Sequence, residues 1–264
     1  MAQRKTEQWR RPLTVKALAK YGGLHFAPPE GSFDPGGAWE LVWQIWLLKP
    51  VRRLPNHHGF IRIRRQPGVS GFLLSVEQQV INTGSLAVQH AEIHCQNDAF
   101  GTPSRWRLNF KLLAFPDLQP LSEAGFSKSG LLQEGKIVTG QRGKTFQRPV
   151  KLPVTSGWGL LEAVQRLAKG NHRELGPFTV LDELDKPKPN QTVQFRKNLT
   201  LPLRGEPVPV RYYQQVGEAW LPWRYYLDGH GRLLVALSGP RAYILNPNTL
   251  EIHQRTLKRE RSRR

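Results

Sequence analysis

Cysteine is almost absent from this sequence, since Cys95 is the only one in 264 residues. With a single thiol no disulfide can form within the chain, so side-chain packing has to hold the fold together. The cysteine count leaves the compartment open.

Long apolar runs are also absent. The longest, from Leu41 to Leu48, is interrupted by Gln44 and is far short of the roughly 20 residues that a membrane-spanning helix needs. No transmembrane segment is therefore predicted. No signal peptide is predicted either, because Lys16 and Lys20 interrupt the stretch where its apolar core would lie. As written, the chain is expected in the cytoplasm, and a cell-envelope location would require a start codon further upstream.

Acidic residues are scarce: 20 Asp and Glu stand against 39 Lys and Arg, which gives a formal charge of +19. Residues 1–20 and residues 255–264 each carry six basic side chains and one acidic one, so +9 remains on residues 21–254. A chain this basic points to acidic partners such as nucleic acid or anionic surfaces. Terminal runs of like charge are more often solvated ends than sites, and residues 255–264 are predicted to be such a basic tail.

Motifs for catalysis or cofactor binding are missing as well. The sequence contains no Gly-rich phosphate loop, nucleophile elbow or HExxH spacing. Asp182, Glu183 and Asp185 fall in one turn-like run, which suits a solvated loop better than an acid/base pair. The pair His57-His58 is interpreted as a turn with exposed imidazoles. No cofactor is predicted, and the chain is interpreted as non-enzymatic, with an enzyme whose residues meet only in the fold as the third hypothesis.

Bulky side chains, in contrast, are plentiful: eight Trp, eleven Phe and six Tyr are spread from Trp9 to Tyr243. They are enough to build one large core over most of the chain. Proline and glycine crowd together between Pro28 and Gly37, which predicts an irregular basic lead-in over residues 1–37. A single β-rich domain is expected to span residues 38–254.

Two-residue alternation runs through most of that domain. The clearest strand is residues 105–115, where apolar side chains at 106, 108, 110 and 112 alternate with polar ones. The run 39–48 is apolar on both faces, which predicts a strand buried on both sides. Between Leu86 and Cys95 the apolar residues change phase, which predicts a bulge near Gln89 or His90.

One helix is predicted near residues 157–169. Ser156 can cap it, apolar residues recur at 160, 161, 164, 167 and 168, and Gly170 lies just past its end. A proline-containing hinge at 186–190 precedes further short strands, as far as 250–253, which turns such as Asp228-Gly229 separate. The predicted fold class is mainly β with one helix (α+β): a curved antiparallel sheet or half-barrel packed on a central helix.

Four stretches carry a resemblance to a known family: VTSGW at 154–158, AVQRL at 163–167, LPWRYYLD at 221–228 and RAYIL at 241–245. In these the chain resembles an uncharacterised family of bacterial, planctomycete-type β-rich proteins. Members are usually exported, although this chain lacks their export signal, and no known activity comes with the resemblance. The arrangement also resembles the periplasmic lipoprotein-carrier fold, in which a curved open sheet wraps over a helix, and that likeness concerns fold alone.

Four residues whose side chains can ligate metals lie within nine positions: His90, His94, Cys95 and Asp98. On a strand the side chains of His90 and His94 lie about 13 Å apart, at roughly 3.3 Å per residue. That separation is too wide for one tetrahedral site, so no metal site is predicted, and Cys95 is interpreted as simply buried. Cys95 is not expected to act as a nucleophile, because His94 points to the opposite face of the strand.

Basic side chains share the faces of two predicted strands. If those strands were close neighbours in the sheet, their side chains would form a surface able to hold phosphates or anionic head groups. The competing interpretation is that they are the water-facing sides of half-buried strands. A nucleic-acid site would also need exposed aromatic rings among the charges, and Trp106 alternates away from them. The anion-binding candidates are Arg62 and Arg64 on one strand and Arg105, Arg107 and Lys111 on the other.

Aromatic residues could line an apolar cavity between sheet and helix, or they could fill the core, which is their more frequent use. The leading hypothesis is a non-enzymatic β-sheet protein with an apolar cavity for a small, lipid-like ligand. The alternative is a basic, nucleic-acid-associated protein that binds phosphates through its sheet arginines and its tails. The cavity candidates are Trp43, Trp46, Trp158, Trp220, Trp223 and Tyr225.

Overall fold

The computed structural model describes residues 12–48 and 55–262, and in this part of the chain 16 strands form one continuous sheet. The first half of the sheet contains β1 (Trp39–Leu48), β2 (Pro55–Pro67), β3 (Gly71–Asn82), β4 (Ser85–Gln96), β5 (Pro103–Ala114), β6 (Gln119–Pro120), β7 (Phe126–Gln133), β8 (Lys136–Gln141) and β9 (Lys144–Pro149). The second half contains β10 (Val154–Ser156), β11 (Glu174–Asp182), β12 (Lys186–Leu203), β13 (Glu206–Val216), β14 (Trp223–Leu227), β15 (Leu233–Ser238) and β16 (Arg241–Leu245).

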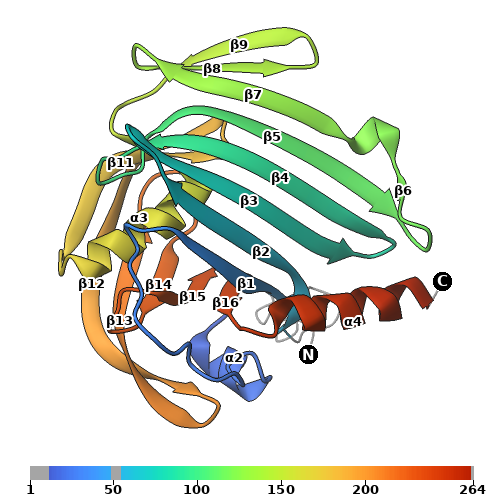
Figure 1. The fold of residues 1–264 in the computed structure, drawn as a ribbon, viewed down its shortest axis with the longest axis vertical. Helices are drawn as coiled ribbons and strands as arrows, with labels where there is room; N and C mark the ends of the chain where they lie inside the picture. The colour runs from blue at the N-terminus through green and yellow to red at the C-terminus, as the bar shows by residue number, and fades with distance from the viewer. Residues whose placement is uncertain (1–11, 49–54, 263–264) are drawn as a thin grey trace, which may run out of the picture.

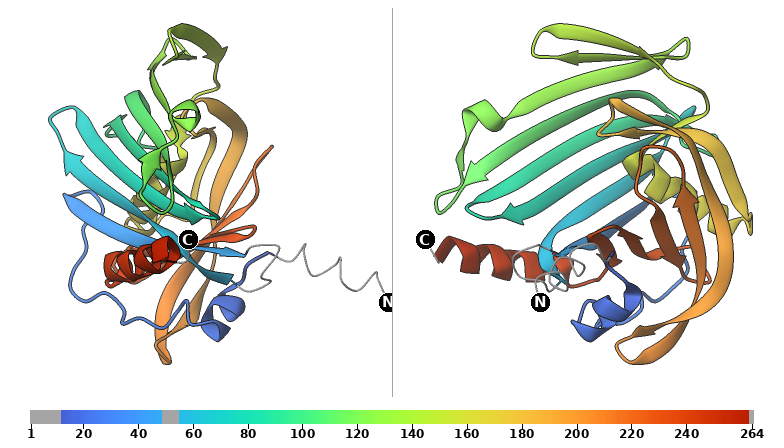
Figure 2. Two further views of the ribbon diagram at one scale, coloured as in Figure 1. Left: turned by 90° about the vertical axis from the view of Figure 1, so that its right-hand side faces the viewer. Right: turned by 180° about the vertical axis from the view of Figure 1, so that it is seen from behind.

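Within each half, strands that follow one another in the chain are neighbours in the sheet, except that β6 forms a short branch that pairs only with β5, so that β7 is the next neighbour of β5. The first and last strands join the two halves, with Trp43 of β1 opposite Leu245 of β16, and β9 and β10 are the two edges. All pairs are antiparallel except β10 and β11, which are parallel because a helix returns the chain between them. The two halves bend towards one another, so the sheet is curved and open (Figures 1 and 2).

The predicted fold class, a mainly β protein with a curved antiparallel sheet, is confirmed. The described residues contain three α-helices rather than one: α2 (Val15–Lys20), α3 (Gly157–Lys169) and α4 (Thr249–Ser262), with a short 3₁₀ turn, η2, at Ser122–Ala124. No helix in the described ranges is both long enough and apolar enough to cross a membrane.

The central helix, α3, has the bounds that its sequence predicts. The side chain of Ser156 accepts a hydrogen bond from the Gly159 amide at 2.8 Å, and Gly170 follows the last turn. Leu160, Leu161 and Val164 are buried among side chains from the inner face of the sheet. Figure 1 shows α3 between the two halves of the sheet, so the helix fills the concave side.

A buried ion cluster anchors α3 to the first half of the sheet. Glu162 is fully buried, and its Oε1 accepts hydrogen bonds from Arg65 Nε at 2.9 Å and from Arg166 Nε at 2.7 Å. The Arg65 guanidinium also donates to the carbonyls of Gly36 and Gly37, and it lies over the Phe72 ring. Because each charge has a partner, the cluster can stay out of water at the junction of helix, sheet and lead-in.

The lead-in over residues 1–37 was predicted to be irregular, but its described part, residues 12–37, contains the short helix α2. Thr14 caps α2 by accepting a hydrogen bond from the Ala17 amide at 3.2 Å, and Leu18 is fully buried in the main core. The proline- and glycine-rich stretch that follows does lack regular structure. Arg232 secures it by donating to the carbonyls of Pro29 and Gly31 at 2.9 and 3.0 Å.

The C-terminal segment differs most from its prediction. Residues 250–253 were predicted as a strand and residues 255–264 as a solvated tail, but 249–262 form helix α4. Leu257 packs on a second apolar cluster formed by Ile81, Leu86 and Val88, on the face of the sheet opposite α3. The local pattern hid this helix because few of its residues are apolar and their partners lie far away in the sequence.

Helix α4 also explains why the predicted bulge near Gln89 or His90 is wrong. The β3–β4 register runs without a shift from Gly71 opposite Gln96 to Asn82 opposite Ser85. The apolar residues change phase because Leu86 and Val88 face α4 while Ile93 and Cys95 face the main core. One continuous strand, whose register with β3 does not shift, therefore buries opposite faces at its two ends.

Two further local predictions fail because tertiary packing overrides them. The pair His57-His58 lies within β2, largely buried, and not in an exposed turn. The proposed hinge at 186–190 is the start of β12, whose Lys188 pairs with Val180 of β11. Its prolines are tolerated there because β13 pairs with β12 only from Thr192 onwards. The side of this stretch that faces away from β11 therefore makes no pairing with the described strands, and a missing N–H costs nothing there.

Candidate binding pocket

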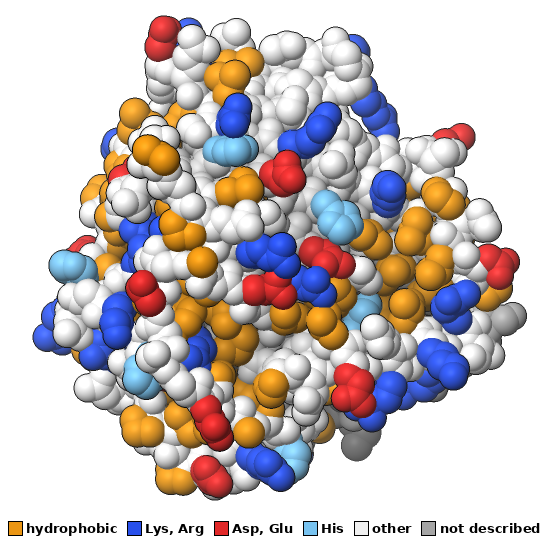
Figure 3. Space-filling model, in the orientation of Figure 1, with side chains coloured by type: hydrophobic (Ala, Val, Ile, Leu, Met, Phe, Trp, Pro, Cys, Tyr) orange, Lys and Arg blue, Asp and Glu red, His pale blue; other side chains and the backbone are white. Residues whose placement is uncertain are grey.

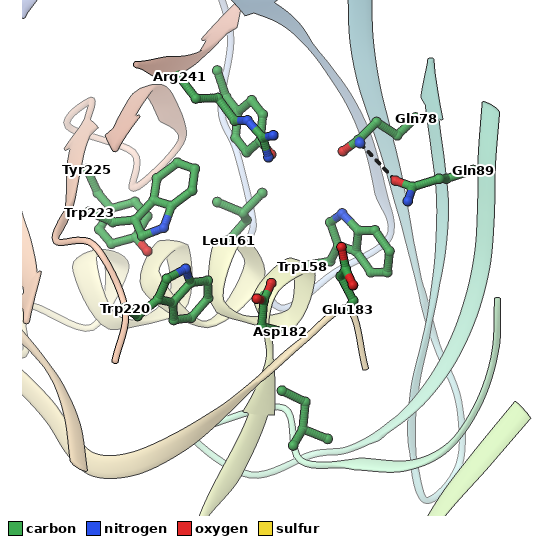
Figure 4. A pocket seen from close by; sticks show the side chains of 13 residues that line it. Gln78, Gln89, Trp158, Leu161, Asp182, Glu183, Trp220, Trp223, Tyr225 and Arg241 are labelled. Carbon is green, nitrogen blue, oxygen red and sulfur yellow. Dashed lines mark hydrogen bonds between the residues drawn. The ribbon is translucent and has the colours of Figure 1, made fainter. Parts of the chain in front are cut away.

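A pocket of about 220 Å³ opens on the concave side of the sheet. It lies where the start of α3 meets β3 and β4 on one side and β14 and β16 on the other, and the turn between β11 and β12 completes it (Figure 4). Its walls come from both halves of the sheet, so it depends on the curvature that brings these halves together.

Aromatic rings form one part of the pocket wall. Trp223 and Tyr225 are two residues apart on β14 and stack with 6.2 Å between ring centroids, and Trp223 lies 5.3 Å from the ring of Tyr243 on β16. Trp158 from the first turn of α3 and Trp220 from the loop before β14 face the same space. Alternation along β14 places Trp223 and Tyr225 on one face, and together the five rings give the pocket a rigid apolar surface.

A chain of buried hydrogen bonds fixes the ring of Tyr225. Its hydroxyl donates to Gln215 Oε1 at 2.9 Å, and Gln215 Nε2 donates to Gln191 Oε1 at 2.8 Å. Gln191 in turn donates to the carbonyls of Pro189 and Glu218. Burial raises the pKa of Tyr225 well above its usual range, so the phenol stays protonated and serves as a fixed wall.

Polar side chains form the other part of the wall. Gln78 on β3 and Gln89 on β4 are directly opposite each other, and Gln78 Nε2 donates to Gln89 Oε1 at 2.8 Å. Asp182 and Glu183 enter from the β11–β12 turn, and Arg241 enters from β16. The pocket is thus amphipathic, with apolar rings and hydrogen-bonding or charged groups around one space.

The charged groups around this turn differ in how they are paired. Glu183 accepts from Lys186 Nζ at 2.6 Å, and this hydrogen bond lowers the pKa of its carboxyl group. Asp185 lies 3.0 Å from Lys128 Nζ. Arg241 donates only a long hydrogen bond, 3.4 Å, to the Tyr243 hydroxyl, and the Asp182 carboxylate has no ion pair within the described residues.

The structure brings four of the six cavity candidates together: Trp158, Trp220, Trp223 and Tyr225 all line the pocket. The other two lie elsewhere in the core. Trp43 donates its indole N–H to the Leu233 carbonyl at 2.8 Å, and Trp46 donates to Gln44 Oε1 at 3.1 Å. Both lie in β1, at the centre of the sheet, where their rings pack in the main core and do not line the pocket.

Sequence reasoning missed the polar wall of the pocket. Asp182 and Glu183 were assigned to a solvated loop, although they do lie at a turn, and Gln78, Gln89 and Arg241 were not singled out. A signal for Gln78 did exist, because it continues the inward-facing positions of Leu74 and Val76 on β3. A polar residue in such a series is a candidate site residue, since burying it needs a partner.

The anion-binding candidates lie on the outer face of the sheet. Arg62 is 3.6 Å from Glu77, and Arg64 is 2.6 Å from Glu40. Two strands separate β2 from β5, which places the two sets of basic residues roughly 14 Å apart at about 4.8 Å per strand. Figure 3 shows basic and acidic side chains intermixed on this face. The residues of the second set, Arg105, Arg107 and Lys111, are exposed on β5.

The His and Cys residues of β4 point to opposite faces. His90 is exposed on the outer face, whereas Cys95 is buried on the inner one, where its Sγ lies 3.7 Å from the Ile93 carbonyl. Within the described residues no group of three or more His, Cys, Asp or Glu side chains is arranged to hold a metal ion.

Cys95 is expected to be unreactive in the folded protein. Burial, reinforced by the charges of Glu162 and Asp98, raises the pKa of its thiol, so little thiolate is present at neutral pH. Ellman's reagent should label the native protein at least about a hundredfold more slowly than the protein in denaturant, since each pKa unit removes about tenfold of the thiolate. Equal labelling rates in the two states would contradict this burial.

Comparisons with known proteins bear on the fold. No family model matches the sequence, and no curated protein matches it. Among solved structures, the fold is similar to a beta-barrel-like protein of Domain of Unknown Function DUF1849 from Brucella abortus, with a TM-score of 0.52 and 12% sequence identity. The match covers 80% of this chain and 95% of that chain. This chain therefore has a curved, barrel-like sheet similar to that of a bacterial protein of unknown function.

Proposed function

We propose that this protein is a non-enzymatic binding protein whose pocket holds the apolar part of a small, amphipathic, lipid-like molecule. The observation that carries the proposal is the composition of the wall, in which five aromatic rings with Leu161 and Leu181 face the same space as the Gln78–Gln89 pair and Arg241. An apolar chain on the rings would leave water, and its polar end would meet the hydrogen-bonding groups.

The size of the pocket limits the ligand. At about 220 Å³ it is smaller than the roughly 300–1,000 Å³ that is typical of pockets for drug-sized ligands. A compact ligand or one end of a single chain fits this volume better than a whole two-chain lipid. Because the rings are fixed by stacking and by the Tyr225 hydrogen bonds, the site needs little rearrangement on binding, which favours affinity.

Replacing Trp220 by alanine tests the proposal. Trp220 is only partly buried, so its loss removes pocket wall without opening the core. We expect the affinity for a single-chain amphiphile, followed by quenching of tryptophan fluorescence, to fall by about tenfold or more, as the loss of about 1.4 kcal/mol of apolar contact predicts.

The matched control is Leu221→Ala, which changes the neighbouring exposed residue outside the pocket wall and should leave the affinity unchanged. Native mass spectrometry of the purified protein gives a second readout, in which an apolar molecule should remain bound. Wild-type protein that neither retains such a molecule nor takes up a fluorescent fatty acid would overturn the proposal.

The alternative function, association with nucleic acid, remains a prediction from the charge of the chain. It would depend on Arg105, Arg107 and Lys111, because Arg62 and Arg64 already face glutamates. The register places Glu92 directly opposite Arg107, which weakens the attraction for phosphate. Gel shifts at two salt concentrations distinguish the two functions, since phosphate binding falls steeply with salt and apolar binding does not.

A further inference from the structure

Two opposite charges line the pocket without pairing with each other. Asp182 and Arg241 both face this space, yet no ion pair within 4 Å joins them. Tyr243 is the main cause that raises the pKa of Arg241, and the Asp182 carboxylate contributes to this rise only from a longer distance. The other carboxylates of the same turn already have lysine partners, Lys186 for Glu183 and Lys128 for Asp185. Asp182 and Arg241 are therefore the charges that this pocket can offer to a ligand.

The two charges lie on different sides of the pocket. Figure 4 shows Asp182 on the side that Trp158 and Trp220 line, and Arg241 on the opposite side, near Gln78. A carboxylate beside indole faces suits an ammonium group, which is attracted both by the charge and by the ring quadrupoles. A guanidinium with amide groups close by suits a phosphate or carboxylate.

We propose that the polar end of the ligand is zwitterionic, with an ammonium group at Asp182, Trp158 and Trp220 and an anionic group at Arg241. This inference rests on the proposed function, because it describes the polar end of the molecule whose apolar part lies on the aromatic wall. A zwitterion contacts both charges at once, whereas a singly charged ligand contacts only one of them. Arg241 is exposed and Asp182 is half-buried, so the advantage of the zwitterion comes from the second charge contact.

Four ligands with the same chain test the inference: octylphosphocholine, octyltrimethylammonium, octyl sulfate and octanol, each below its micelle concentration and followed by calorimetry. The zwitterion should bind about tenfold more tightly than each of the other three, which corresponds to one good charge contact. Asp182→Asn should weaken octylphosphocholine and octyltrimethylammonium but not octyl sulfate. Arg241→Gln should weaken octylphosphocholine and octyl sulfate but not octyltrimethylammonium.

Controls separate these effects from net charge and from folding. Asp117→Asn and Arg196→Gln make the same charge changes at exposed positions outside the pocket and should alter no affinity. Circular dichroism confirms that each variant is folded. Equal binding of all four ligands would overturn the zwitterion and leave the apolar pocket standing, whereas binding of none of them would overturn both proposals.

Discussion

Replacing Glu162 by glutamine should lower the free energy of unfolding by about 3–5 kcal/mol, the usual loss when one partner of a buried ion pair is removed. Glu162 is fully buried, and it is the shared partner of Arg65 and Arg166, of which Arg65 is 2% exposed. Glutamine keeps the size of the side chain but not its charge, so the Arg65 cation would stay buried without a counter-charge. Urea denaturation followed by circular dichroism measures the change.

The matched control for Glu162 is Glu251→Gln on α4. Glu251 also pairs with an arginine four residues on, Arg255 at 3.5 Å, but both side chains are about two-thirds exposed. Its replacement should change stability by no more than about 0.5 kcal/mol, because exposed helical pairs contribute little. The double variant Arg65→Met/Glu162→Leu should recover part of the loss by removing both buried charges. A Glu162→Gln loss as small as that of the control would show that the cluster does not anchor α3.

Lowering the pH from 7 to 5 should reduce the free energy of unfolding through two histidines at the contact between α4 and β2, His253 on the helix and His57 on the strand. His57 and His253 lie with 5.9 Å between ring centroids, and His253 bonds Gln79 at 3.0 Å. Burial, together with the charges of His253 and His58, lowers the pKa of His57 to about 3, and burial lowers the pKa of His253 to about 4.

The sign follows from comparing the folded and unfolded states. Both imidazoles have a pKa near 6.5 when unfolded, so below this pH the unfolded state takes up protons that the folded state refuses. Stability contributed by neutral histidines is complete above pH 6.5 and is lost as the pH falls towards the folded values. At pH 5 the expected loss is up to about 2 kcal/mol per histidine, at 1.36 kcal/mol for each pH unit below 6.5.

The pH slope of stability, rather than stability itself, is the readout. The double variant His57→Gln/His253→Gln should lose most of the slope between pH 7 and 5, whatever its stability at neutral pH. His90→Gln changes an exposed imidazole on β4 and should keep the wild-type slope. A slope that survives in the double variant would mean that other groups cause it, and that α4 does not bury these rings.

Elements defined by residues close together in the chain could be predicted from the sequence, whereas elements defined by contacts between distant residues could not. The alternation in β5 and the cap and stripe of α3 involve neighbours in the chain, and the structure has these elements within the predicted bounds or close to them. The bulge near Gln89 and the strand at 250–253 were wrong for one shared reason. Each was inferred from a local pattern whose meaning depended on α4 packing against strands more than 160 residues earlier.

The candidate site shows the same division. The aromatic rings of Trp223 and Tyr225 could be proposed from sequence because bulky alternating residues are visible there. Gln78, Asp182 and Arg241 come from three separate strands or turns, and only the curvature of the sheet places them around one space. Nothing in their immediate neighbours marks a glutamine or an aspartate as part of a pocket wall.

The sequence by itself determined that this chain is a mainly β protein with a capped central helix, because strand and helix periodicity depend on residues two to four positions apart. The tertiary structure alone decided where α4 lies and which tryptophans and charged side chains line the pocket. Those features depend on the closing of β1 against β16 and on the bending of the sheet, and both join parts of the chain that are far apart in sequence.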